Sequence, residues 1–123
     1  MTEAYQDEFI PAVAAADIQS QQVVLFEVGG LQLILTRLEG RVYAFSSECP
    51  HASGDMSGST ISRKGRIDCP DHGYVFDIRS GRITWPEDEN YCLRQFPVRE
   101  VDGQVWVKVK LPLGGKNRGG VGA

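Results

Sequence analysis

Short apolar and β-branched runs, separated by glycine and other turn residues, follow one another from Phe9 onward. The run 23–28 ends at a Gly-Gly pair and the apolar pattern resumes over 31–37, which predicts a hairpin with a glycine turn. A further strand is predicted over 41–45. Because no long stretch shows the period of a helix, the pattern predicts an all-β domain of antiparallel strands.

The clearest strand pair is near the end of the chain. Residues 96–101 and 104–109 alternate between apolar and polar positions, and the Asp-Gly pair between them favours a hairpin turn. The stretch 114–120 is glycine-rich and has too little apolar surface to fold. We therefore expect a folded domain over 9–110, an N-terminal extension over 1–8 and a flexible C-terminal tail over 111–123.

Length and composition exclude several classes of protein. With 123 residues the chain is long enough for one core and too short for two ordinary domains. A net charge of -3 gives no support to nucleic-acid or anionic-membrane binding. No apolar run is long enough to cross a bilayer, and the acidic N-terminus differs from the basic start of a secretion signal. Three cysteines, an odd number, favour reduced thiols over disulfides, so we expect a cytoplasmic protein.

Candidate metal ligands gather in the polar segment 46–93, which contains both histidines of the chain. Cys49 and His51 have one residue between them, Cys69 and His72 have two, and 17 residues separate the two pairs. Thiolate and imidazole suit either zinc or an iron–sulfur cluster, and four such ligands satisfy a tetrahedral zinc or two irons bridged by sulfide. The residue types alone leave both open.

Two other interpretations are weaker. A chance gathering of structural residues is a poor explanation, because both histidines and two of the three cysteines fall in two loops of matching form. A structural zinc site is disfavoured because zinc loops usually separate their first two ligands by at least two residues, whereas the first pair here is Cys-x-His.

The two loops, Cys-Pro-His at 49–51 and Cys-Pro-Asp-His-Gly at 69–73, resemble the signature of the Rieske iron–sulfur family. The resemblance covers roughly residues 9–110 and implies a Rieske fold, with small antiparallel sheets stacked as a sandwich and two cluster-binding loops at one tip. It also implies a [2Fe-2S] cluster with Cys49 and Cys69 on one iron and His51 and His72 on the other, the histidines being the electron's exit.

The loops depart from the respiratory members of that family. Those proteins place an extra cysteine in each loop to form a disulfide, whereas the corresponding region here offers Met56 and Asp71 and no thiol. They also place hydroxyl groups near the sulfurs, where this chain has Tyr74 and Phe76, and we expect both rings to pack under the loop. Fewer hydrogen bonds to sulfur predict a midpoint potential of about -150 mV.

Three further features complete the sequence analysis. Gly73 is expected to adopt a positive φ after the second histidine and to let the backbone approach the cluster closely, with a simple turn glycine as the alternative. Cys92 is expected to be a buried thiol that binds no metal. The acidic run 87–89 is interpreted as a solvated turn, with the steering of a basic partner as the alternative.

The function expected from the resemblance is electron transfer without catalysis. Both histidines are committed to the cluster, so none remains for the mononuclear iron of a terminal oxygenase, and no glycine fingerprint for a dinucleotide follows a strand. We expect a soluble ferredoxin that carries one electron from a flavin reductase to a terminal oxygenase. The alternative is a cluster-bearing small subunit of a nitrite reductase-like enzyme. No nucleic-acid or membrane partner is expected.

Overall fold

The computed structural model describes residues 5–51, 54–70 and 73–112. These residues form strands and one short 3-10 turn, η1, and the strands pair antiparallel throughout, which confirms the predicted all-β class. The elements are β1 (Tyr5–Ala14), η1 (Ala15–Asp17), β2 (Val24–Val28), β3 (Leu31–Leu38), β4 (Arg41–Ser46), β5 (Arg66–Asp68), β6 (Val75–Asp77), β7 (Ile83–Trp85), β8 (Gln95–Phe96), β9 (Val98–Val101) and β10 (Gln104–Pro112).

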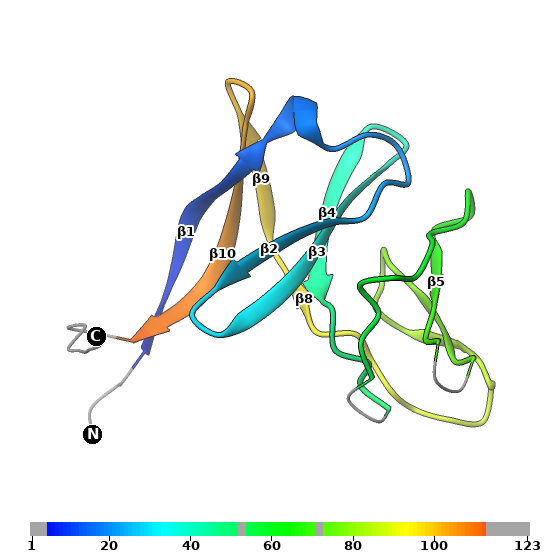
Figure 1. Cartoon of the computed structure of the whole chain (residues 1–123). Helices are drawn as coiled ribbons and strands as arrows, with labels where there is room; N and C mark the ends of the chain where they lie inside the picture. Colours follow the sequence, from blue (N-terminus) through cyan, green and yellow to red (C-terminus); the bar gives the residue numbers. More distant parts are fainter. Residues whose placement is uncertain (1–4, 52–53, 71–72, 113–123) are drawn as a thin grey trace.

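The strands form three small sheets. Their orders are β1-β10-β9, β2-β3-β4-β8 and β5-β6-β7. In Figure 1 the four-stranded sheet lies in the middle, with β1 and β10 on one side and the green segment that contains β5 on the other. The central sheet therefore separates the strands near the two ends of the chain from the segment that carries the candidate ligands.

The predicted hairpins are confirmed. β2 pairs with β3, β3 with β4, and β9 with β10. The turn residues Asp102 and Gly103 both have positive φ, at 49° and 79°. Two successive positive φ values give the turn a twist that matches the twist of the flanking strands, which is why Asp-Gly favours this kind of hairpin.

The predicted strand 96–101 is divided between two sheets at Pro97. Gln95–Phe96 pairs with β4, whereas Val98–Val101 pairs with β10. Proline has no N–H to donate to a ladder, so pairing on that side stops there. The Pro97 carbonyl still accepts the Lys108 N–H at 2.9 Å. This bond links the end of β8 in the central sheet to β10 in the outer sheet.

The second strand of the central sheet, β3, has buried side chains on both faces, and alternation along it divides them between two cores. Leu33 and Leu35 belong to one core, shared with β10, whereas Ile34 belongs to the site core on the other face. All three are 0% exposed, and full burial of such a side chain contributes about 2 kcal/mol. The core shared with β10, called the hairpin core, comprises Ile18, Leu33, Leu35, Val42, Ala44, Phe96, Val105, Val107 and Val109. The site core comprises Ile34, Leu38, Phe45, Cys49, Met56, Ile61, Ile67, Cys69, Phe76, Ile78 and Leu93.

The outer strands are longer than the apolar pattern indicated. β1 begins at Tyr5 because its backbone pairs with β10 as far as Tyr5↔Pro112, and such pairing does not require apolar side chains. Residues 1–4 of the expected extension and 113–123 of the expected tail lie outside the described residues. Within the described part of the chain, no helix has the length and apolar character needed to span a membrane.

Candidate metal centre

The first loop, residues 47–56, leaves the end of β4 and closes on itself. The Cys49 N–H donates to the Gly54 carbonyl at 2.7 Å, and the Met56 N–H donates to the Ser47 carbonyl at 2.8 Å. Ser47 is fixed in turn to the central sheet, because its N–H and its hydroxyl donate to the carbonyl and side-chain oxygens of Gln32, each at 3.0 Å. These bonds hold Cys49 in the site core at 1% exposure.

The second loop, residues 69–74, joins β5 to β6 and repeats this backbone pattern. The Cys69 N–H donates to the Tyr74 carbonyl at 2.7 Å, and the Gly73 N–H returns to the Cys69 carbonyl at 2.8 Å. In both loops, therefore, the cysteine N–H binds the carbonyl five residues later. Gly73 has φ of 71°, as expected. Cys69 is 1% exposed and belongs to the same core as Cys49.

The ring of His51 contacts the rings of two tyrosines. Its ring stacks on Tyr74, with centroids 4.0 Å apart and planes 23° from parallel, and meets Tyr91 edge-on at 5.5 Å and 79°. The two tyrosine rings are 6.1 Å apart. Such aromatic pairs are worth about 0.5–1.5 kcal/mol beyond the area they bury. Tyr91 was missed at the sequence level, because no local pattern indicates a contact with a residue 40 positions away.

The surroundings of Tyr74 disfavour the charged form of its phenol and so raise its pKa. Partial burial raises its pKa above the usual 10.0, and the negative charges of Glu89 and Asp88, together with Tyr91 and Cys49, raise the pKa further. The acidic run 87–89 therefore lies within electrostatic reach of the loops. Its first two side chains are exposed, as expected for a solvated turn.

The remaining expectations are mixed. Phe76 is 0% exposed in the site core, which confirms its packing role. The prediction for Cys92 is wrong, because this thiol is exposed. The neighbouring Leu93 is 4% exposed and belongs to the core, and successive side chains of an extended segment point to opposite faces. Asp71 and His72 lie outside the described residues, so the assignment of His72 remains a prediction.

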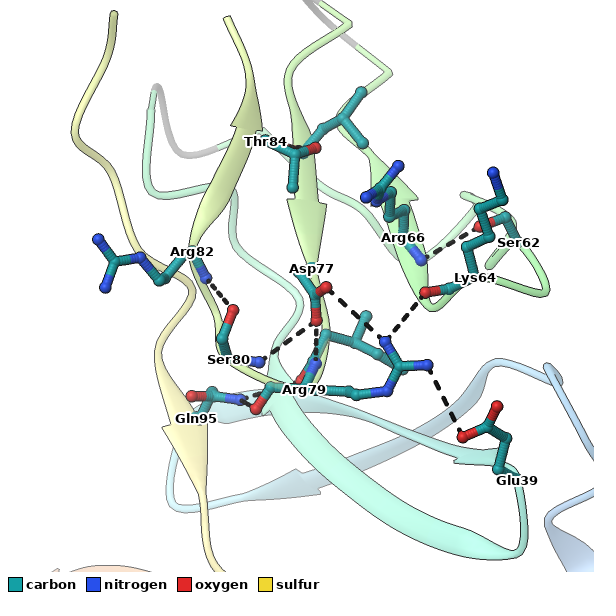
Figure 2. A network of polar contacts seen from close by, with 12 residues as sticks. Glu39, Ser62, Lys64, Arg66, Asp77, Arg79, Ser80, Arg82, Thr84 and Gln95 are labelled. Atoms are coloured by element: carbon teal, nitrogen blue, oxygen red, sulfur yellow. Dashed lines mark hydrogen bonds and ion pairs between the residues drawn. The ribbon is translucent and has the colours of Figure 1, made fainter. Parts of the chain in front are cut away.

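Polar contacts attach the small sheet β5-β6-β7, which carries the second loop, to the central sheet (Figure 2). The side-chain amide of Gln95, in β8, donates to the carbonyls of Ile78 and Arg79 at 3.0 and 2.9 Å. The Arg79 guanidinium donates to the Lys64 carbonyl at 3.1 Å and lies 3.8 Å from Glu39, whose side chain is 76% exposed. The ion pair is weak at this exposure, under about 1 kcal/mol, so the amide bonds are the stronger attachment.

The described donors fit an iron–sulfur cluster. Cys49 and Cys69 are buried in one core and neither is in a disulfide, and His51 adjoins the second loop through its ring contact. Soft thiolates with borderline imidazoles are the donors that such clusters take. Among the described residues alone, no three His, Cys, Asp or Glu side chains are grouped as a metal site.

The fold and the paired loops define a Rieske-type iron–sulfur protein. The sequence model of the Rieske [2Fe-2S] domain matches residues 8–97, and the chain therefore belongs to this family. The family's [2Fe-2S] cluster is its cofactor, and the predicted Rieske fold is confirmed.

Several of its relatives are ferredoxin components of oxygenase systems. The ferredoxin component of an alkene monooxygenase system from Xanthobacter autotrophicus is 28% identical, over 89% of this chain and 88% of the relative. The ferredoxin component of a naphthalene 1,2-dioxygenase system from Pseudomonas putida is 33% identical, over 75% of this chain and 86% of the relative. A solved complex of reduced oxygenase and oxidized ferredoxin in carbazole 1,9a-dioxygenase contains a chain that matches with a TM-score of 0.71 and 27% identity, over 80% of this chain and 91% of that one.

Proposed function

We propose that this protein carries single electrons from a flavin-dependent reductase to a terminal oxygenase in the cytoplasm. Cys49, Cys69, His51 and His72 bind the cluster. The observation that carries the proposal is the pair of loops with the same closing hydrogen bond, each of which holds a buried thiol in the site core. Relatives that are ferredoxin components of oxygenase systems support it.

The ligand types suit this task. A [2Fe-2S] cluster supplies one-electron chemistry, and replacing two thiolates by neutral imidazoles raises its potential above that of an all-cysteine cluster. Cys49 and Cys69 are buried in the site core, whereas His51 is partly exposed. The histidine side is thus the route by which a docked protein comes close to the metal. Oxygen activation belongs to the acceptor, since both histidines of the chain are used here.

Metal analysis tests the proposal directly. Protein purified without air should contain about two irons and about two acid-labile sulfides per chain, and dithionite should produce a paramagnetic signal. With NADH and a flavin-dependent ferredoxin reductase, the loaded protein should then reduce cytochrome c. A colourless preparation that contains zinc and no iron would contradict the proposal.

Two further measurements refine it. The midpoint potential should be about -150 mV, because Phe76 has no hydroxyl and stands where respiratory members place one near the sulfurs. A value well above zero would contradict this. Gel filtration of host lysate should show the protein as a free, small species. Co-elution with a large enzyme would instead favour a permanent subunit.

A further inference from the structure

The two cluster loops are joined differently at their base and at their tip. At the base, the Ser59 hydroxyl donates to the Asp68 carbonyl at 2.6 Å, just before Cys69. Near the ligands, His51 of the first loop stacks on Tyr74 of the second. None of the three cysteines is in a disulfide.

We propose that the rings of His51, Tyr74 and Tyr91 form a noncovalent tie that holds the two loops together and fixes the imidazole plane of His51. Tyr74 and Tyr91 are positioning residues in this scheme. The inference rests on the proposed function, because it takes His51 as a ligand of the cluster.

The geometry restrains the imidazole in two directions. Tyr74 covers its face at 23° from parallel, so a tilt of the imidazole toward Tyr74 meets the phenol ring. Tyr91 meets it at 79°, nearly perpendicular, so rotation of the ring within its own plane changes the edge contact. Stacked and edge-to-face arrangements are the two that aromatic quadrupoles favour, so both contacts are attractive as they stand.

Both tyrosines stand on fixed backbone, which lets them act as supports. The Tyr74 carbonyl accepts the Cys69 N–H at 2.7 Å, and both tyrosine side chains are partly buried against the site core. The segment after Tyr91 is held by its backbone. Cys92 pairs with Arg82 in an isolated antiparallel β-bridge, and the Leu93 N–H donates to the Gly81 carbonyl at 2.7 Å. The tie therefore connects three segments that are far apart in the sequence.

The consequence is kinetic. Loss of the cluster requires the two loops to separate, and separation breaks the His51–Tyr74 stack. A chain with the stack should open more slowly than one without it. The same stack should keep His51 in one orientation, and the electronic structure of a cluster responds to the orientation of its ligands.

The test compares ring removal with hydroxyl removal in the cluster-loaded protein. Tyr74→Leu and Tyr91→Leu keep an apolar side chain and remove the ring, whereas Tyr74→Phe and Tyr91→Phe keep the ring and remove the hydroxyl. With a chelator present, loss of visible absorbance should be about three- to tenfold faster in Tyr74→Leu and less accelerated in Tyr91→Leu, and within about twofold of the parent in both Phe variants. The g values of the reduced protein should shift in the Leu variants only.

A destabilised control separates the tie from general loss of stability. Val107→Ala opens a cavity in the hairpin core, where Val107 is 0% exposed, and touches neither loop. It should lower the melting temperature and leave the g values as in the parent. Leu variants that match the parent in both loss rate and g values overturn the inference, as do Phe variants that behave like the Leu variants. If the parent itself binds no iron, the proposed function fails first.

Discussion

The hairpin core and the site core are built from the same central sheet and differ in what specifies them. The hairpin core receives its side chains from long strands with regular alternation, such as Leu33 and Leu35 of β3 against Val105 and Val107 of β10. The site core is covered by strands of only three residues, and its loops are shaped by backbone hydrogen bonds such as Cys49 N–H to the Gly54 carbonyl.

Because of this difference, we expect substitutions in the hairpin core to affect mainly stability and substitutions in the site core to affect the cluster as well. A substitution in a long strand removes one of many packed side chains and leaves the strand's backbone pairing in place. A substitution in a loop that depends on a few specific hydrogen bonds changes the conformation of the loop. The hairpin core can therefore tolerate conservative apolar exchange with small effects. In the site core the same exchange acts on the positions of Cys49 and Cys69, which are part of its packing.

The largest expected effect comes from removing a buried thiol. Cys69→Ser should lose nearly all bound iron, because a hydroxyl is a poorer ligand than thiolate for an iron–sulfur cluster. Cys92→Ser is the matched control, since that thiol is exposed and outside both loops, and it should retain the iron of the parent. Iron and sulfide analysis of both variants is the measurement. Equal loss in both would place Cys92 among the ligands.

The second effect uses two neighbouring residues of β3 that face opposite cores. Leu33→Ala and Ile34→Ala each remove a side chain that is 0% exposed, so each should lower the free energy of unfolding by about 2–5 kcal/mol. Only Ile34→Ala should also accelerate cluster loss, because Ile34 shares its core with Cys49 and Cys69. Thermal unfolding and the decay of visible absorbance report the two quantities separately. Equal acceleration in both variants would show that the cores are not independent.

The sequence predicted those parts of the fold whose signals are local. Alternation and the Asp102-Gly103 turn are visible within a few residues, and the structure contains the hairpin they indicate. The family was recognisable because ligand spacing within each loop is also local. Pro97 carried a local signal as well, and it explains why the predicted strand 96–101 is shared between two sheets.

The rest depends on contacts that no local pattern encodes. Strands of three residues, such as β5, β6 and β7, are too short to show a period. The approach of Tyr91 to His51 joins distant segments, so it could not be read from either one. Cys92 was predicted to be buried because free cysteines generally are. Its neighbour Leu93 is buried instead, and because successive side chains of an extended segment point to opposite faces, the Cys92 thiol is exposed.

A smaller effect on stability is expected at the contacts between the central sheet and the small sheet β5-β6-β7. Gln95→Ala removes both bonds from the amide to the Ile78 and Arg79 carbonyls and should cost about 1 kcal/mol. Glu39→Ala removes a long ion pair at an exposed site and should cost less than about 0.5 kcal/mol. Melting temperatures of the two variants give the order. A larger loss in Glu39→Ala would mean that the guanidinium, and not the amide, attaches the small sheet.

The smallest effect concerns acid. The Asp55 carboxylate accepts the Ser57 N–H at 2.9 Å, and this bond, with that from the Ser57 side chain, lowers the pKa of Asp55 below the usual 3.8. A lowered folded-state pKa stabilises the first loop above pH 3.8, and the contribution is lost as the pH falls below 3.8 through the folded value. Asp55→Asn should therefore lower the melting temperature slightly at neutral pH and reduce its further decline in acid. Melting curves of the parent and the variant between pH 7 and pH 3 measure the difference, and parallel curves across that range would show that the bond contributes nothing to the loop.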